Sequence, residues 1–582
     1  MNLKIENIPT YGDFKLPIFY QCTKTPLNHI LSNDLELTKI NEKNFEEDNE
    51  CNPESVYDII FKPKLPEDKE LCNKWSEFTS SNIRFLGDSQ KLIQSVDKSV
   101  KFEEEDEFLN NIDDTLNLQE EDFLNRYMYL DYNWLKSFNS VHVILLILSL
   151  NTLLGPLQSL LSPLSLFFLA LIPIPNLKET KYLERVKLFA VKHPLWGLFF
   201  GSFKDFKYKE KLNSLISIII FGFRSYFNVK SFKNFIKIIR VQYDYVKSCN
   251  EYLVNSLEKT ELLMEKTSKL KSYSDFHSRL ENHKSNLKLI INRLSPIACV
   301  NYSLKNIGFM GKCRAAFYDL YTNEGYKETV KYSRYLNSFI HQLNILQSYL
   351  KNKIISKAKF GGKKFYIKGL IHPIFKERKG IKNDCTLMKN YLITGPNASG
   401  KTTFIKSIMI NTIITQQFGM GFYEKARIRP YIHFHCYLNI PDTSGRDSLF
   451  QAESRRCKEV IDALEEDDQG YSLCLFDELF SGTNPEEAAA SAFAFIEYLS
   501  KKSNCRFLLT THFYDVCLKI DYNKSILNLH MDAHKENEKI KYFYKIKKGI
   551  SNLKGGLSIL KDLNYPKHLI DNAKSFSESV KK

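Results

Sequence analysis

The residues with the clearest chemical potential lie at 390–403, where an apolar run leads into a glycine-rich loop that ends in lysine and threonine. The loop fits the pattern G-x-x-x-x-G-K-[ST], and a helical pattern follows at 403–414. The backbone N–H groups of such a loop and the positive end of the next helix can surround a phosphate. A chance match is the alternative, which the flanking strand and helix disfavour. We predict a nucleotide-binding loop formed by Gly395, Pro396, Asn397, Ala398, Ser399, Gly400, Lys401, Thr402 and Thr403.

Two acidic residues, Asp477 and Glu478, directly follow a second apolar run at 473–476. A strand of this kind brings the first carboxylate beside the phosphate loop, where it can hold Mg²⁺ together with the Thr402 hydroxyl. Lys401 would reach the β- and γ-phosphates, and Glu478 would polarise the attacking water. The sequence therefore predicts Thr402 and Asp477 as metal ligands, and Lys401 and Glu478 as catalytic residues.

A histidine ends a third apolar run, at 507–512. Taken alone, His512 is more often a capping or core residue. Its place after a strand beside the one that carries Asp477 favours a site residue, because the carboxyl ends of parallel strands meet at one crevice. A neutral imidazole there could bond the γ-phosphate or the water that attacks it.

The elements that must position these residues alternate between strand and helix. An edge strand at 364–368 opens the domain, 471–476 is a buried strand, 485–500 an alanine-rich helix, 507–510 a further strand, and 526–531 and 540–547 a pair of β-runs. We predict an α/β P-loop NTPase domain at 363–548.

Three motifs together resemble the MutS family of mismatch-repair ATPases: ITGPNASGKTT at 393–403, FDELFSGT at 476–483 and TTHF at 510–513. Weaker matches lie at 372–373, at 383–384 and at 549–573. The last is similar to the family's C-terminal helix-turn-helix, so the resemblance implies a dimerisation segment at 549–582. It also implies the ABC/MutS type of ATPase fold, ATP and Mg²⁺ as cofactors, and His512 as a sensor of the γ-phosphate.

The resemblance further implies that a second subunit completes each ATP site. Residues 444–453 are similar to the loop that reaches into the opposite site, where Ser448 would touch the nucleotide. Asp447 departs from the family's usual loop. Gly380 stands where the family often has an aromatic residue that stacks on adenine. The family's mismatch-reading domain has no counterpart within residues 1–230.

The rest of the chain is less specific. Residues 1–136 are acidic, with runs such as 46–48 and 103–107, which predicts a partly disordered or loosely helical region. Residues 178–362 form a helical lever or core. There, Tyr273, Leu280, Leu287 and Leu294 recur every seventh residue as a packing seam, and residues 295–296 break it.

No Asp, Glu, Lys or Arg occurs at 137–177, and Gly155 and Pro156 interrupt this apolar run. Such a run reaches roughly 60 Å as helix, about twice the hydrocarbon thickness of a bilayer. We therefore predict a transmembrane hairpin here, with a buried helical pair as the alternative. The lysines that follow would face the cytosol. Residues 212–223 are also apolar but too short to span, so they are expected in a core or an interface.

Composition agrees with an intracellular protein. The formal charge of +15 suits a polyanionic partner or, equally, a solvated basic surface. The 12 cysteines form no C-x-x-C pair, which indicates reduced thiols in the cytosol or nucleus. Our leading hypothesis is a dimeric, Mg²⁺-dependent, MutS-like ATP hydrolase that couples ATP to DNA binding, as in mismatch repair or recombination. The alternative is a membrane-anchored, ATP-gated scaffold without a DNA role.

Overall fold

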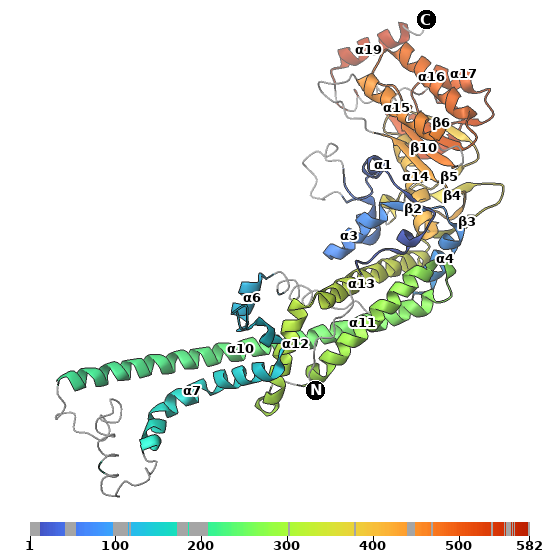
Figure 1. Ribbon diagram of the computed structural model, residues 1–582. Helices are drawn as coiled ribbons and strands as arrows, with labels where there is room; N and C mark the ends of the chain where they lie inside the picture. Colours follow the sequence, from blue (N-terminus) through green and yellow to red (C-terminus); the bar gives the residue numbers. More distant parts are fainter. Residues whose placement is uncertain are drawn as a thin grey trace. The chain divides into compact units, whose positions relative to one another are not determined.

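Two units divide the chain in this computed structural model (Figure 1). The first comprises Met1–Gly12, Phe102–Lys259 and Asn282–Ser333, and the second Asp13–Lys101, Thr260–Glu281 and Arg334–Lys582. The structure describes residues 12–579 except 41–53, 97–114, 116–117, 171–183, 185–207, 301–302, 377–379, 439–448, 467–469, 537–538, 552, 554–559, 561–562 and 564. The units differ from the contiguous domains expected from sequence because three long helices contribute residues to both.

The described residues of the first unit are helical. They form α6 (Glu120–Arg126), η3 (Lys136–Ser140), α7 (His142–Ala170), η5 (Leu304–Phe309), α12 (Met310–Thr322) and parts of the three shared helices α10 (Tyr208–Thr267), α11 (Ser274–Ala298) and α13 (Glu324–Lys351).

Arg314 on α12 is the central buried cation of this unit. Its guanidinium donates to the Ser149 hydroxyl on α7 at 3.1 Å and to the Tyr127 carbonyl at 3.3 Å. It also lies over the Phe235 ring of α10, 5.5 Å from the centroid. Gly311 lets α12 approach α7 closely, since a Cβ there would lie 2.1 Å from the His142 carbonyl oxygen. One cation thus joins α7, α10 and α12.

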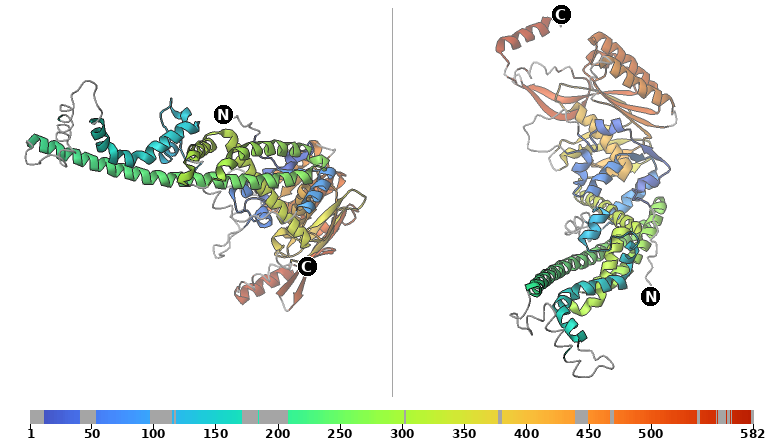
Figure 2. Two further views of the ribbon diagram at one scale, coloured as in Figure 1. Left: turned by 90° about the horizontal axis from the view of Figure 1, so that it is seen from below. Right: turned by 60° about the vertical axis from the view of Figure 1, so that its left-hand side comes forward.

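The predicted hairpin within 137–177 is not seen in the described residues. Gly155 and Pro156 lie inside α7, which is one continuous helix. A proline removes one backbone hydrogen bond and bends a helix without having to end it. Helix α10 also runs beside α7 (Figures 1 and 2), and the Asn228 amide of α10 donates to the Gly155 carbonyl at 3.3 Å. Residues 212–223 lie on α10 and are largely exposed, so they are not core.

The second unit holds the strands. A six-stranded sheet has the order β13-β12-β6-β11-β10-β9 and a five-stranded sheet the order β5-β4-β8-β3-β7. Their bounds are β3 (Ser356–Phe360), β4 (Tyr366–Leu370), β5 (Asn383–Thr386), β6 (Asn390–Thr394), β7 (Met420–Gly421), β8 (Lys425–Ile428), β9 (His433–Tyr437), β10 (Ser472–Asp477), β11 (Cys505–Thr510), β12 (Ile526–Glu536) and β13 (Lys539–Lys548). The helices of this part are η6 (Pro373–Phe375), α14 (Lys401–Phe418), α15 (Leu449–Glu466), α16 (Pro485–Lys501), α17 (Tyr514–Ile520) and α19 (Lys567–Ser579).

Residues 13–96 fold in the second unit, where the acidic composition predicts at most loose helices. They form η1 (Pro17–Tyr20), β1 (Lys24–Pro26), α1 (His29–Asp34), α2 (Val56–Phe61), α3 (Pro66–Trp75), β2 (Phe78–Ser80) and α4 (Ile83–Ser95). Gln417 on α14 accepts from the Tyr57 hydroxyl at 2.8 Å and donates to the Trp75 carbonyl at 2.6 Å. The rings of Phe61 on α2 and Trp75 on α3 also pack on the Phe418 ring of α14, with centroids 5.8 and 4.4 Å apart. The acidic runs at 46–48 and 103–107 lie outside the described residues.

The other local expectations are mostly confirmed. The seam residues Tyr273, Leu280, Leu287 and Leu294 are all buried. Two details differ from expectation. Strand β4 is not an edge, because β5 and β8 pair with it on either side, and Pro296 lies inside α11 rather than after it.

Candidate functional site

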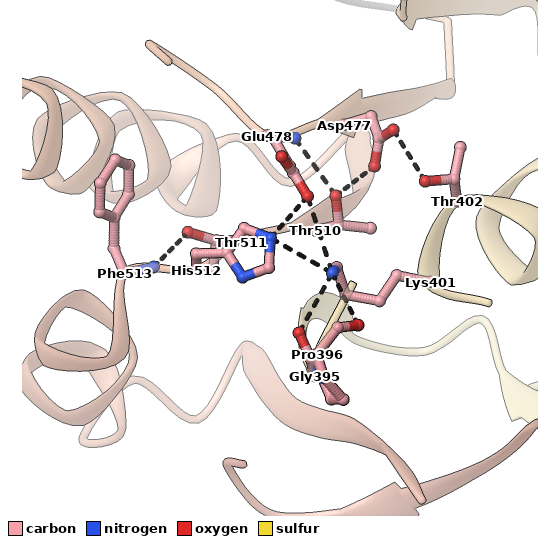
Figure 3. Close-up of polar contacts among 10 residues, drawn as sticks. All are labelled: Gly395, Pro396, Lys401, Thr402, Asp477, Glu478, Thr510, Thr511, His512 and Phe513. Atoms are coloured by element: carbon pink, nitrogen blue, oxygen red, sulfur yellow. Dashed lines mark hydrogen bonds and ion pairs between the residues drawn. The ribbon is translucent and has the colours of Figure 1, made fainter. Parts of the chain in front are cut away.

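Three parallel strands end side by side at the candidate site. Asp477 at the end of β10 pairs with Thr510 of β11, and Thr510 pairs with Ile393 of β6. The segments that follow these strands therefore meet at one edge of the sheet, as the sequence predicts (Figure 3). Side chains far apart in the chain come into contact there.

The loop between β6 and α14 has the backbone that its glycines allow. Gly395 has φ +151° and Gly400 has φ +91°, and α14 begins directly at Lys401. A side chain at Gly400 would also press on a ring, because a Cβ there would lie 3.2 Å from Cδ1 of Tyr544. The N-terminus of α14 consequently faces the loop, which is the geometry that binds phosphate.

The Lys401 side chain lies across this loop and is 5% exposed. Its Nζ donates to the carbonyl oxygens of Gly395 at 3.1 Å and Pro396 at 3.3 Å, and lies 3.6 Å from Oε1 of Glu478. Burial lowers the pKa of the Lys401 amine, and the Glu478 carboxylate opposes that shift. The amine is thus a buried cation held by two loop carbonyls, which phosphate oxygens can replace as acceptors.

The Thr402 hydroxyl donates to Oδ2 of Asp477 at 2.8 Å, and the Thr510 hydroxyl donates to the other oxygen, Oδ1. Within the described residues no group of three or more His, Cys, Asp or Glu side chains could hold a metal ion. One carboxylate and one hydroxyl are, however, the donor set that suits Mg²⁺ when phosphate oxygens and waters supply its other ligands. Thr402 and Asp477 therefore fit the metal that the sequence predicts.

Glu478 and His512 form the second pair. Nε2 of His512 lies 2.8 Å from Oε1 of Glu478, and this hydrogen bond is the main reason why the pKa of Glu478 is lowered. Glu478 has φ +51°, and its N–H donates to the Thr510 carbonyl at 3.2 Å. Backbone strain of this kind costs on the order of 1–3 kcal/mol and gathers at functional sites.

A cavity of about 770 Å³ opens beside these groups. Of the predicted residues, Asn397, Ala398, Ser399, Gly400, Lys401, Thr402, Thr403 and Glu478 line it. Gly395 and Pro396 contact Lys401, while Asp477 and His512 contact Thr402 and Glu478 respectively. Ser448 lies outside the described residues. The size is that of a small-molecule site.

Sequence reasoning assigned no role to three residues at this site. The Thr510 hydroxyl bonds Asp477 and also accepts from the Glu478 N–H at 3.2 Å. Glu453 on α15 is buried and accepts from the Ser481 N–H at 3.0 Å, so it holds the loop after Glu478. Phe375 lines the cavity. Of the three, only Thr510 could have been predicted from the sequence, because it is the last residue of a strand that ends at the site.

Comparisons with known proteins agree with this geometry. Residues 391–581 match the family model described as MutS domain V. The chain is 27% identical over 272 residues to the DNA mismatch repair protein MutS of Bacillus cereus (strain AH187), covering 44% of this chain and 30% of the relative. It is also 27% identical over 277 residues to the protein of that name from Listeria innocua serovar 6a, covering 45% and 32%.

The chain thus spans about a third of the length of the curated relatives that it matches. The matched region contains the phosphate loop, Asp477, Glu478 and His512. Residues 391–581 are thus similar to domain V of the MutS family.

Proposed function

We propose that this protein is a Mg²⁺-dependent ATP hydrolase of the MutS type. The observation that carries the proposal is the contact between Thr402 and Asp477 at the N-terminus of α14, with Glu478 and His512 beside it. This arrangement combines a phosphate-binding loop, a metal-binding pair and a residue that can act on water. The family match supports it.

In this mechanism the loop N–H groups and the Lys401 amine bind the ATP phosphates. Glu478, kept ionised by His512, accepts a hydrogen bond from a water molecule and aims its oxygen at the γ-phosphorus. The water oxygen bonds to the γ-phosphorus as the bond from that phosphorus to the bridging oxygen breaks, so ADP and phosphate form and the proton of the water passes through Glu478 to solvent. Mg²⁺ held by Thr402 and Asp477 would offset negative charge on the phosphate oxygens.

The second part of the proposal concerns partners. We infer from the family that two subunits pair, that residues 444–453 including Ser448 reach the other subunit's nucleotide, and that 549–582 help to hold the pair. ATP binding would close the dimer and hydrolysis would open it. The curated relatives are named as DNA mismatch repair proteins, and the formal charge of +15 suits DNA.

The direct test is ATP hydrolysis by the full-length protein, with and without a panel of mismatched, branched and perfect duplex DNA. Hydrolysis that needs Mg²⁺ and responds to one DNA form supports both parts. ATP hydrolysis without salt-dependent DNA binding would overturn the proposal that the protein acts on DNA. The alternative of an ATP-gated scaffold without a DNA role would then remain. If no ATP binds and none is hydrolysed, the ATPase proposal itself fails.

A third proposal is that α7 and the first part of α10 associate with a lipid bilayer. By length and composition, two stretches could cross a membrane, His142–Ser159 and Lys211–Thr267. Exposed apolar side chains share one face of α7, namely Val143, Ile147, Leu154, Leu157 and Leu161, and one side of α10, namely Leu215, Ile219, Ile220 and Phe223. Exposed apolar surface of this extent marks an interaction site, and a lipid bilayer is one partner that covers such a surface.

Charge on α10 favours lipid over a protein partner. Residues 211–243 contain Arg224, Lys230, Lys233, Lys237 and two further basic residues and no acidic one. Basic residues that follow an apolar stretch are typical of the cytosolic side of a membrane. This would place the ATPase domain on the cytosolic side.

Flotation of the full-length protein with vesicles, with and without phosphatidylserine, tests the membrane proposal. Wild type should float with the anionic vesicles, whereas Leu157→Lys with Leu161→Lys should reduce flotation. Asn234→Lys with Asn255→Lys adds the same charge at exposed positions of α10 that follow its exposed apolar residues at 212–229, and this control should float. A wild-type protein that binds neither vesicle would exclude the membrane.

A further inference from the structure

The lining of the cavity beside the phosphate loop contains two chemically different groups, which define a phosphate end and an apolar end. Residues 397–403 supply N–H groups, hydroxyls and the Lys401 amine. The apolar group gathers around Gly380, where a Cβ would lie 2.8 Å from Cβ of Phe375 and 3.7 Å from Cδ1 of Ile371. A ligand that fills both ends needs a polyanionic part and a flat or apolar part, and a nucleoside triphosphate has both.

Phe375 is the aromatic side chain at the apolar end. It closes the short helix η6, whose N-terminal cap is His372. The two rings lie 6.3 Å apart at an interplanar angle of 68°, an edge-to-face contact that fixes the orientation of the Phe375 ring. The ring is only half-buried, so one part of it remains open to the cavity.

Gly380 explains why this ring can occupy its place. A Cβ on Gly380 would lie 2.8 Å from Cβ and 3.6 Å from Cγ of Phe375. A side chain at 380 and the Phe375 ring would therefore compete for the same space. Because residue 380 is glycine, the aromatic group at this end of the cavity comes from η6.

We propose that Phe375 stacks on the base of the bound nucleotide. Residue 380 is glycine and has no side chain that could make this contact. This inference rests on the proposed ATPase function. It names the residue that lets the protein bind a nucleotide more tightly than a polyphosphate without a base. Stacking uses the face of the base and not its edges, so the contact should favour ATP and GTP to a similar extent.

Tyr544 is a further aromatic side chain that lines the cavity, and it serves as the matched control. It lies at the phosphate end, since a Cβ on Gly400 would touch its Cδ1 at 3.2 Å. If it contacts the ligand, it contacts the phosphates, which ATP and tripolyphosphate share. Its removal should change the affinity for both by the same factor.

The test measures the dissociation constants of ATP and of inorganic tripolyphosphate for the full-length protein with Mg²⁺. We expect Phe375→Ala to weaken ATP binding about tenfold and to leave tripolyphosphate binding unchanged, since loss of one stacked ring has an effect of this size. Phe375→Trp should retain the preference for ATP. Tyr544→Ala should leave the ratio of the two constants as in wild type.

Rescue gives the sharpest result. Gly380→Phe in a Phe375→Gly background should restore part of the preference for ATP, because Phe375→Gly also removes the Cβ that would lie 2.8 Å from a Cβ at 380. The proposal is overturned if Phe375→Ala weakens both ligands equally or neither, or if only Tyr544→Ala changes the ratio. A wild-type protein that binds neither ligand would instead contradict the proposed ATPase function.

Discussion

The Thr402 hydroxyl donates to Oδ2 of Asp477 at 2.8 Å, although 75 positions separate the two residues in the chain. Thr402 is the second residue of α14, the helix that follows the phosphate loop. Asp477 ends β10, which lies two places from β6 in the sheet. Their contact joins the loop that would bind phosphate to the carboxylate that would bind the metal. The predictions below start from this contact and extend to the rest of the molecule.

Removal of the Thr402 hydroxyl should weaken the metal site. We expect Thr402→Val, which keeps the shape of the side chain, to raise the Mg²⁺ concentration for half-maximal ATP hydrolysis roughly tenfold, the effect of one bond to a charged group. Thr402→Ser retains the hydroxyl and is the control. A Mg²⁺ titration of both variants measures the shift, and equal titrations would contradict the role assigned to Thr402.

Substitutions at Glu478 and Lys401 should affect different steps, ATP hydrolysis in the first case and ATP binding in the second. Glu478→Gln is expected to bind ATP like wild type and to hydrolyse it about 10²–10⁴-fold more slowly, because an amide aligns water poorly. Lys401→Ala should lose ATP binding, since a buried cation beside the phosphates disappears. Equilibrium ATP binding and single-turnover ADP formation measure the two effects. Wild-type turnover by Glu478→Gln would refute its assignment.

His512 should set the acidic limit of activity. The hydrogen bond from His512 is the largest influence that lowers the pKa of Glu478 below its ordinary value of 4.5. Removal of this bond in His512→Ala should raise that pKa, so the carboxylate becomes protonated at a higher pH. We expect the acidic limb of the kcat/KM profile to move to higher pH in this variant.

The same lowered pKa has a consequence for stability. The ionised Glu478 carboxylate is favoured in the folded protein, so its contribution is present above pH 4.5 and is lost as the pH falls below that value. In His512→Ala the loss of stability with acid should therefore be smaller. Urea midpoints of the two proteins between pH 3.5 and pH 7, a range that brackets ordinary carboxyl pKa values, check this prediction.

Arg314 should be a stability determinant of the helical unit. Arg314→Ala leaves the buried carbonyls of Tyr127 and Met128 without a donor and opens a cavity between α7, α10 and α12, at a cost of about 3 kcal/mol. Lys312→Ala removes an exposed cation from the same helix and is the control. Urea unfolding followed by circular dichroism should show a lower midpoint for Arg314→Ala alone.

Local sequence determined the domain that holds the phosphate loop to a large extent. The pattern at 390–403 requires positive φ at Gly395 and Gly400, and the strand at 472–477 needs buried apolar residues before Asp477. Both requirements involve only neighbours in the chain, so they can be predicted from residue types and spacing. The parallel order of these strands also follows, because helices long enough to cross over separate them.

Tertiary structure alone decided the rest. Pro156 does not end α7, residues 13–96 pack on α14 through contacts such as Tyr57 with Gln417, and Phe375 fills the space beside Gly380. Each of these depends on segments that are distant in the chain and meet only after folding. Periodicity and motif spacing contain no information on which distant side chain fills a given space, because packing is set by shape and burial in three dimensions.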